Sequence, residues 1–184
     1  MASEAPDPAP EPGQALVDVE IANVTFVETG AEVVAAAGEA RKLDLARSLG
    51  AEVAVDYTEP GWADRLAEQV GGVAVVFDGV GGDIGRAAFE LLMPGGRFCA
   101  FGLASGAFAD VTDDEAAARG VTRVQAGRAA PVEQRERTCS ALREAVAGRL
   151  RPTIGQTFPL AEAAAAHTAI ESRATLGKTL LLAR

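Results

Sequence analysis

Cysteine, histidine and aromatic residues are scarce in this sequence. It has two cysteines and one histidine in 184 residues, and its aromatic content is 5%. Cys99, Cys139 and His167 cannot be assembled into a convincing zinc ligand set by their spacing. No arrangement of serine, histidine and aspartate, or of cysteine and histidine, is legible as a nucleophilic site. We therefore expect neither a metal site nor nucleophilic catalysis.

Positive charge and long apolar runs are also lacking. Lysine and arginine number 17 against 26 acidic residues, which gives a formal net charge of -9. An acidic surface repels nucleic acid and anionic membranes, and no apolar run approaches the ~20 residues needed to cross a bilayer. The chain has neither a CxxC pair nor the pattern of a signal peptide. These absences predict a cytoplasmic protein with a small-molecule substrate and no nucleic-acid or membrane partner.

Strand and helix patterns alternate regularly after residue 30. Short apolar runs are followed by amphipathic segments, and residues 73–78 (VAVVFD) are apolar up to the last position, as expected for a strand covered on both faces. This alternation is typical of a parallel sheet with covering helices. We expect strands at 31–36, 52–57, 73–78, 96–102 and 121–126, and helices at 39–50, 60–70 and 83–93.

The two ends of the chain differ from this alternating region. Residues 1–13 alternate proline with small or acidic residues, which predicts an extended, flexible lead. Residues 15–22 (ALVDVEIA) alternate apolar with largely acidic positions, the pattern of a half-buried strand. Near the other end we expect a helix at 132–147, a strand at 151–160, an alanine-rich helix at 161–173 and a terminal strand at 177–184.

The turn after the run AEVVAAAG is a candidate nucleotide site. Gly38 ends this run, and a glycine there lets a ribose or phosphate approach the backbone. Arg41 and Lys42 follow at the start of the next helix, where they could hold a 2'-phosphate by charge. An ordinary turn with a solvated basic face remains the alternative. Glu39 also leaves the choice of cofactor open, because an acidic residue favours ribose hydroxyls.

Two glycine-containing loops form a second candidate site. Residues 78–85 (DGVGGDIG) follow the strand 73–78, and their glycines would let a flat ligand lie against the carboxyl ends of the strands. The alternative is a flexible loop in which Asp83 caps the next helix. A neighbouring loop follows the segment 91–102 (LLMPGGRFCAFG) and continues through Ser105. Two such loops on adjacent strands are a more specific signal than either alone.

Taken in order, these segments resemble the medium-chain dehydrogenase/reductase superfamily, closest to its zinc-independent quinone oxidoreductase branch. The resemblance rests on AEVVAAAGEARKLDLARSLGAEVAVDY, VVFDGVGG, LLMPGGRFCAFGLASG and IGQTFPLAEAAAAHTAIESRATLGKTLLL. It implies a Rossmann-like α/β fold with a mostly parallel sheet and covering helices. It divides the chain into a lead at 1–13, a remnant of an N-terminal, GroES-like substrate domain at 14–30, a partial dinucleotide-binding domain at 31–130 and C-terminal helices and strands at 131–184 that return to the remnant.

The resemblance implies NADPH as the cofactor and assigns contacts to its phosphate-bearing end. Lys42 matches a lysine that contacts the 2'-phosphate, and Tyr57 matches a strand-end tyrosine beside the same phosphate. Gly38 and Arg41 belong to the same turn and are expected at the same end. Lys178 matches a lysine of the C-terminal return that lies near the cofactor.

The resemblance also assigns residues along the rest of the cofactor. Gly79 and Val80 match the loop near the ribose and adenine. Phe101, Gly102 and Ser105 match the loop that lines the nicotinamide. All five belong to the two glycine-containing loops described above.

The chain departs from the family between Thr29 and Ala31. It lacks most of the substrate domain, the first coenzyme-domain strand, the glycine-rich phosphate turn and the helix behind that turn, so the resemblance describes a truncated member. Loss of a central strand leaves its neighbours with unpaired backbone groups. We expect residues 15–22 or 23–29 to fill this gap, or a second copy to pair through an edge strand. The family also implies a homodimer formed through 121–126.

Two functions follow from the resemblance. The first is an NADPH-dependent oxidoreductase of the quinone or enone reductase type, in which hydride passes to an electrophilic small molecule. The second is a non-catalytic remnant that serves as a nucleotide-binding or oligomerisation module, because the missing turn would hold the pyrophosphate. A methyltransferase ranks last, since neither its glycine-rich first motif nor its acidic strand end is visible. Whether the chain is an enzyme stays open.

Overall fold

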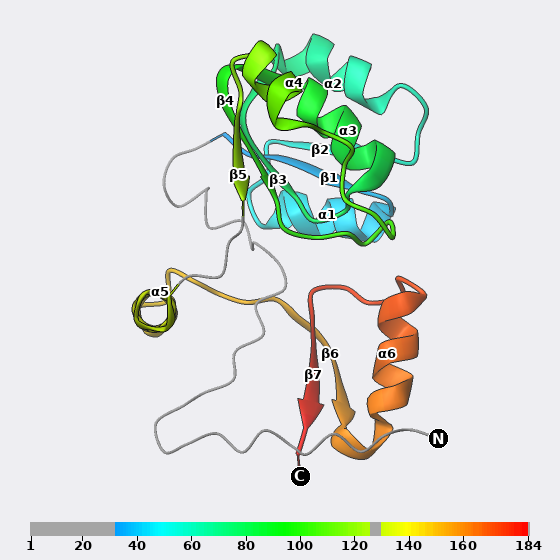
Figure 1. Cartoon of the computed structure of the whole chain (residues 1–184). Helices are drawn as coiled ribbons and strands as arrows, with labels where there is room; N and C mark the ends of the chain where they lie inside the picture. Colours follow the sequence, from blue (N-terminus) through cyan, green and yellow to red (C-terminus); the bar gives the residue numbers. More distant parts are fainter. Residues whose placement is uncertain (1–31, 126–129, 184) are drawn as a thin grey trace, which may run out of the picture.

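Parallel strands and their connecting helices build a Rossmann-like α/β structure (Figure 1). The structure is a computed structural model that describes residues 32–125 and 130–183. The strands are β1 (Val34–Ala37), β2 (Val53–Asp56), β3 (Val73–Asp78), β4 (Leu92–Ala100), β5 (Thr122–Gln125), β6 (Ile154–Pro159) and β7 (Lys178–Leu182). The helices are α1 (Ala40–Ser48), α2 (Trp62–Val70), α3 (Gly82–Glu90), α4 (Asp113–Ala118), α5 (Pro131–Val146) and α6 (Ala163–Glu171), with a 3-10 turn η2 (Leu160–Glu162) before α6.

The strands are hydrogen-bonded in three groups. β1 pairs with β2, β3 and β5 both pair with β4, and β6 pairs with β7, and every pair is parallel. The parallel arrangement expected from the sequence is therefore confirmed, but it is interrupted between β1 and β3, which are not hydrogen-bonded to each other. The segments 15–22 and 23–29, expected to fill a gap in the sheet, lie outside the described residues.

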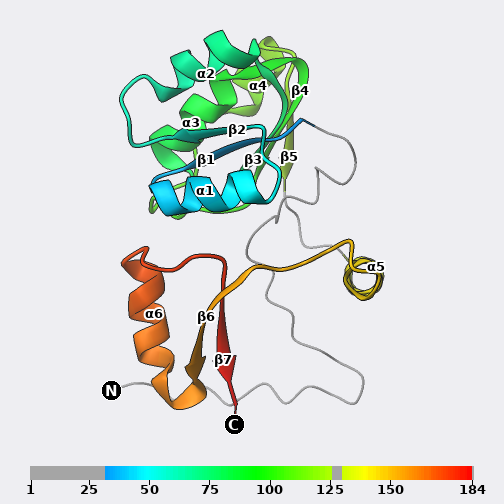
Figure 2. The same cartoon turned by 180° about the vertical axis from the view of Figure 1, so that it is seen from behind.

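Helices cover these strands on two sides. α1 lies on one side of β1 and β2, whereas α2 and α3 lie on the other (Figures 1 and 2). Trp62 and Leu66 of α2 form a buried cluster with Leu91, which follows α3. Val34 of β1 and Val73 of β3 both pack against this cluster. One core therefore spans the interruption between the two sheets.

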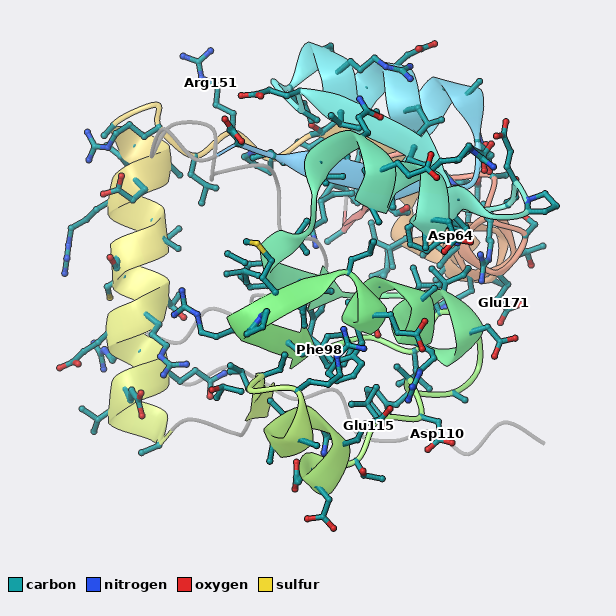
Figure 3. All side chains as sticks on the ribbon, turned by 90° about the horizontal axis from the view of Figure 1, so that it is seen from above. Asp64, Phe98, Asp110, Glu115, Arg151 and Glu171 are labelled. Atoms are coloured by element: carbon teal, nitrogen blue, oxygen red, sulfur yellow. The ribbon has the colours of Figure 1, made fainter. Side chains whose placement is uncertain are left out.

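The face of β3, β4 and β5 that points toward α3 and α4 is closed by a second core. Phe98 of β4 is 2% exposed and meets Phe89 of α3 edge to face, with ring centroids 5.4 Å apart. Figure 3 shows Phe98 enclosed by other side chains, with Asp110 and Glu115 nearer the surface. The same core also contains Leu92, Val111, Ala116 and Val121.

The opposite face of the same three strands is open. The register places Phe77, Cys99 and Val124 side by side across β3, β4 and β5. Phe77 is 46% exposed and Val124 is 40% exposed, while Cys99 is partly buried. The apolar run 73–78 predicts a strand covered on both faces. Among the described residues, α3 and α4 cover one face closely, and the face that carries Phe77 is more exposed.

The boundary between α3 and β4 differs from the sequence-based prediction. The expected helix 83–93 ends at Glu90, and the expected strand 96–102 begins at Leu92. Leu92 pairs with Val73, and the register then shifts so that Arg97 pairs with Val75. β4 thus begins before Pro94, Gly95 and Gly96, and these residues form an irregularity within the strand.

The C-terminal strands form a sheet of their own beside α6 (Figure 1). The predicted helices and strands of this region are confirmed as α5, β6, α6 and β7, with ends shifted by a few residues. Several large apolar side chains of β6, η2, α6 and β7 are exposed, namely Ile154, Leu160, Ile170, Leu180, Leu181 and Leu182. None of the helices described combines the length and apolar character that crossing a membrane requires.

Candidate functional site

A basic pair stands at the start of α1 and meets the turn that follows α6. The Arg41 Nε lies 2.7 Å from Glu39 Oε2, and the Lys42 Nζ lies 2.9 Å from Glu39 Oε1. Arg41 also donates to the backbone carbonyl of Ala174 at 2.9 Å, and Lys42 donates to that of Arg173 at 3.1 Å. The two predicted phosphate ligands are therefore held together by one carboxylate and by two backbone carbonyls.

The charges in this group do not cancel. Hydrogen bonds from Lys42 in the first place, and from Arg41 in the second, hold the pKa of Glu39 below its usual value of 4.5. Glu39 is consequently ionised at neutral pH and offsets only one of the two cations. The remaining positive charge suits a phosphate, which arginine and lysine bind by charge-assisted hydrogen bonds.

Gly38 and Tyr57 lie next to this basic pair. A Cβ atom at Gly38 would come within 2.9 Å of Tyr57 Cε2, so the ring lies directly against the backbone at the end of β1. Tyr57 is partly buried and packs against the cluster that contains Trp62. The structure thus brings Gly38, Arg41, Lys42 and Tyr57 to one turn, and Gly38 has a packing reason to be a glycine.

The two glycine-containing loops are joined through their backbones. Phe101 and Gly102 donate their N–H groups to the Asp78 carbonyl at 2.9 and 3.2 Å, and Ser105 donates its N–H to the Val80 carbonyl at 2.8 Å. Gly102 lies so close to the carbonyl of Gly79 that no Cβ atom could stand between them. These contacts confirm that the sequence placed the two loops correctly as neighbours. They also mean that the glycines serve contact between the loops.

Asp78 organises the first loop, and the sequence-based reasoning assigned it no role. Its Oδ1 accepts the N–H groups of Val80 and Gly81 at 2.9 and 2.8 Å. Its Oδ2 is buried without a hydrogen-bond partner among the described residues. An aspartate that precedes a glycine-rich turn is the signal that could have identified it, because such a side chain bonds to backbone N–H groups just after it.

Asp83 does not cap α3 as the alternative interpretation of this loop expected. The residue before α3 is Gly81, whose φ of 73° lies in the region that favours glycine, and Asp83 lies in the first helical turn. The Asp78 carboxylate instead receives the N–H groups that precede the helix.

Arg173 connects the basic pair to the second loop and was also missed. Its backbone carbonyl accepts from Lys42, and its guanidinium donates to the carbonyl of Ala104 at 2.7 Å. Arg173 has a φ of 57°, the one positive φ of a non-glycine residue within the described part of the chain. The turn after α6 therefore contacts both ends of the predicted cofactor site.

Lys178 lies at the start of β7, shortly after this turn. Its backbone N–H donates to the Thr153 carbonyl at 2.7 Å, and its Nζ is buried. The structure leaves its predicted contact with a cofactor untested. As for metals, the described ranges contain no group of three or more histidine, cysteine, aspartate or glutamate residues that could hold an ion.

The arrangement fits a dinucleotide in part. Two cations and a tyrosine ring lie at one end, and two loops joined by backbone hydrogen bonds lie at the other. A glycine-rich turn that could hold a pyrophosphate is not found among the residues that the structure describes. Gly81 of the first loop lies against Ala107, and Gly82 lies against Ser105 of the second loop.

Comparison with known proteins places the chain in a family. The family model for zinc-binding dehydrogenases matches residues 49–181. Quinone oxidoreductase-like protein 2 of Bos taurus is 36% identical over 159 residues, which cover 82% of this chain and 45% of the relative. The quinone oxidoreductase of Pseudomonas aeruginosa is 34% identical over 162 residues, which cover 83% and 49%. The chain thus spans about half the length of the curated relatives it matches.

Solved structures of similar fold agree with this result. The quinone oxidoreductase of Escherichia coli, solved in complex with NADPH, is 28% identical with a TM-score of 0.74, over 86% of this chain and 52% of that one. A mycobacterial protein solved in complex with NADPH is 30% identical with a TM-score of 0.76, over 86% and 51%. With the family model matching well over half of its residues, the chain belongs to the zinc-binding dehydrogenase family, within the medium-chain dehydrogenase/reductase superfamily.

Proposed function

We propose that this chain binds NADPH and serves an oxidoreductase of the quinone or enone reductase type. The observation that carries the proposal is the pairing of Arg41 and Lys42 beside Gly38 and Tyr57, which leaves one uncompensated positive charge at the end of β1. A 2'-phosphate distinguishes NADPH from NADH, and it is the group that such a charge selects. Two similar proteins were solved in complex with NADPH, which supports the same assignment.

In this proposal each end of the site has its own task. Arg41 and Lys42 hold the 2'-phosphate, and the Tyr57 ring closes the turn beside it. The loop that begins with Gly79 and Val80 lies along the ribose and adenine. Phe101, Gly102 and Ser105 line the nicotinamide, and Lys178 approaches the cofactor from β7.

NADPH, when bound, supplies a hydride for an electrophilic carbon of a small-molecule substrate. The chain's own residues orient the cofactor and keep the two loops in a fixed relation through the hydrogen bonds from Phe101, Gly102 and Ser105. No proton donor is assigned among the described residues. We expect the reaction to be independent of zinc and therefore insensitive to chelators.

A second candidate is a nucleotide-binding or oligomerisation module without turnover. The observation that favours it is that the described residues provide no glycine-rich turn for the pyrophosphate. β5 pairs only with β4 within the described part of the chain, so its other edge is free for a second copy. We propose a homodimer formed through this edge in either case.

The test is a titration with NADPH and NADH that follows thermal stability. A ligand at 100 times its Kd stabilises the folded state by about 2.7 kcal/mol, which raises the Tm of a chain of this size by about 5–10 °C. We expect this shift with NADPH and a smaller one with NADH. Lys42→Ala should remove the preference for NADPH.

Arg47→Ala is the matched control. Arg47 lies on the same helix and forms an exposed ion pair with Asp44 at 3.0 Å. Its replacement removes a positive charge from α1 and leaves the residues at the start of the helix unchanged. This variant should keep the shift with NADPH. Equal shifts in both variants would mean that the cofactor does not bind at the start of α1, and no shift in the wild type would remove the proposed function. Turnover of a quinone with NADPH then separates the enzyme from the non-catalytic module.

A further inference from the structure

We propose that Asp78 is a positioning residue that fixes the loop after β3 and the loop after β4 as one unit. Its effect on NADPH and NADH rests on the proposed function, whereas the coupling of the two loops is a property of the fold alone. Asp78 is the last residue of β3 and is 5% exposed, so its contacts are made inside the protein. Within the described ranges, no other polar or charged residue is as deeply buried.

Asp78 contacts each loop through a different group. Its carboxylate Oδ1 accepts the N–H groups of Val80 and Gly81 in the loop after β3, at 2.9 and 2.8 Å. Its backbone carbonyl accepts the N–H groups of Phe101 and Gly102 in the loop after β4, at 2.9 and 3.2 Å. One residue therefore sets the point from which both loops leave the sheet.

The second carboxylate oxygen of Asp78 shows that this arrangement has a price in stability. Asp78 Oδ2 is buried and has no hydrogen-bond partner among the described residues. Buried polar atoms normally have such a partner, and one without it destabilises the folded protein. The burial of Oδ2 is thus not explained by stability, and the purpose of the carboxylate lies in the loop that Oδ1 holds.

Gly85 of α3 leaves the space that the Asp78 carboxylate occupies. A Cβ atom at Gly85 would come within 2.2 Å of Asp78 Oδ2 and within 2.9 Å of the Ala109 Cβ. Gly85 is not among the described glycines with a positive φ, so its backbone conformation does not require glycine. Alanine favours a helix more than glycine does. The helix therefore carries a weaker helix former at the one place where a methyl group would displace the carboxylate.

The two loops that Asp78 fixes serve the part that NADPH and NADH have in common. In the proposed function, the loop that begins with Gly79 lies along the ribose and adenine, and the loop that begins with Phe101 lines the nicotinamide. The two cofactors differ in the 2'-phosphate, which is assigned to the start of α1. A change at Asp78 should therefore weaken both cofactors by the same factor, whereas Lys42→Ala should weaken NADPH selectively.

The first test is amide hydrogen exchange of the full-length protein without cofactor, followed by nuclear magnetic resonance. Asp78→Ala removes the acceptor of the Val80 and Gly81 N–H groups, so the exchange of these two amides should accelerate. If the loops form one unit, the amides of Phe101 and Gly102 should accelerate with them, by at least about tenfold relative to the wild type. Acceleration confined to Val80 and Gly81 would overturn the proposal, whatever the protein binds.

The second test is the dissociation constants of NADPH and NADH, measured by calorimetry at a temperature where each variant is folded. Asp78→Ala and Gly85→Ala should each raise both constants at least about tenfold and leave their ratio unchanged, because both variants disturb preformed loops. Asp78→Asn keeps an oxygen in the place of Oδ1 and should stay within about twofold of the wild type. Wild-type affinity in Asp78→Ala, or a loss confined to NADPH, would overturn the proposal. A wild type that binds neither cofactor would remove the proposed function, and the exchange test would then decide whether Asp78 couples the loops.

Thr112→Ala is the matched control. Thr112 Oγ1 accepts the N–H group of Glu115 at 3.1 Å at the start of α4, so this variant loses the same kind of hydrogen bond outside the two loops. It should be less stable than the wild type, with both dissociation constants and the loop amides unchanged. Equal losses of affinity in Thr112→Ala and Asp78→Ala would assign the effect to stability and overturn the positioning role. Gly85→Ala takes the place of Asp78→Ala in both tests if Asp78→Ala does not fold.

Discussion

The two faces of the β3–β4–β5 sheet carry similar apolar residues and are covered to very different extents. Phe98 is 2% exposed beneath α3 and α4, whereas Phe77, on the neighbouring strand and the opposite face, is 46% exposed. Both residues sit in strands of one sheet, and a strand sends successive side chains to opposite faces. An apolar run in the sequence therefore predicts that a residue belongs to a strand. How much that residue stabilises the fold depends on whether a helix covers its face of the sheet.

The largest expected effect comes from truncating the same residue type on each face. Phe98→Ala removes a buried ring that meets Phe89 and should lower the free energy of unfolding by about 3–5 kcal/mol. Phe77→Ala should cost about 1 kcal/mol or less, because nearly half of that side chain already faces solvent. Urea denaturation of the two variants measures both values. Equal losses would mean that the face carrying Phe77 is covered in solution.

Asp78 is a polar residue on the covered face, where it ends β3 two residues after Val76. Asp78→Ala leaves the N–H groups of Val80 and Gly81 without their acceptor and should lower the free energy of unfolding by about 1–3 kcal/mol. Asp78→Asn keeps an oxygen in the same place and should cost less. Denaturation of both variants tests this order, and an Asn variant as unstable as the Ala variant would contradict the role assigned to Oδ1.

The ion pair between α3 and α4 joins the two helices over the covered face and predicts a pH dependence. Arg86 Nη2 lies 2.5 Å from Glu115 Oε1, and the hydrogen bond from Arg86 holds the pKa of Glu115 below its usual 4.5. A pKa that is lower in the folded state adds stability above the unfolded-state value, and this stability is lost as the pH falls through the folded-state pKa. Wild type should therefore exceed Glu115→Gln in stability at neutral pH.

That advantage should diminish as the pH falls below about 4.5. Denaturation midpoints of the two proteins, measured over a series of pH values, give the difference directly. Glu144→Gln is a useful control, since its partner Arg149 likewise lowers the pKa of Glu144 but the pair lies in the C-terminal region. A wild-type advantage from Glu115 that grows on acidification would contradict the expected direction of the pH dependence.

The smallest expected effect lies away from both faces, at the start of α1. Glu39→Gln removes the carboxylate that offsets Arg41 and Lys42, so it should strengthen NADPH binding by about twofold to fivefold, the range of an exposed ion pair. NADH binding should not improve, because it lacks the 2'-phosphate. Dissociation constants for both cofactors check the prediction, and Asp44→Asn on the same helix is the control. An equal gain for NADH would assign the effect to general charge.

Much of the fold could be predicted from the sequence because its signals are local. The strand 73–78 was placed at its observed bounds, since an apolar run there is enclosed by Gly72 and Gly79. The end of α3 was misplaced because residues 91–93 are apolar, which suits a helix as well as a strand. Pairing with Val73 decided between the two, and that contact is not visible in the sequence.

The candidate site was predicted unevenly for the same reason. The sequence brought Gly38, Arg41 and Lys42 together because they are neighbours in one turn, and the family resemblance added Tyr57. Arg173 could not be found this way, because its contacts are with residues distant in the sequence. Its carbonyl accepts from Lys42, which lies more than a hundred positions earlier. The cofactor contacts themselves remain predictions, including that of Lys178.

Arg173 links the start of α1 to the loop that follows β4. Its carbonyl accepts from Lys42, its guanidinium donates to Ala104, and both groups belong to a single residue held at a positive φ. A displacement of this turn shifts both contacts at once. Replacement of Arg173 would therefore change the surroundings of Lys42 and of the loop after β4 together.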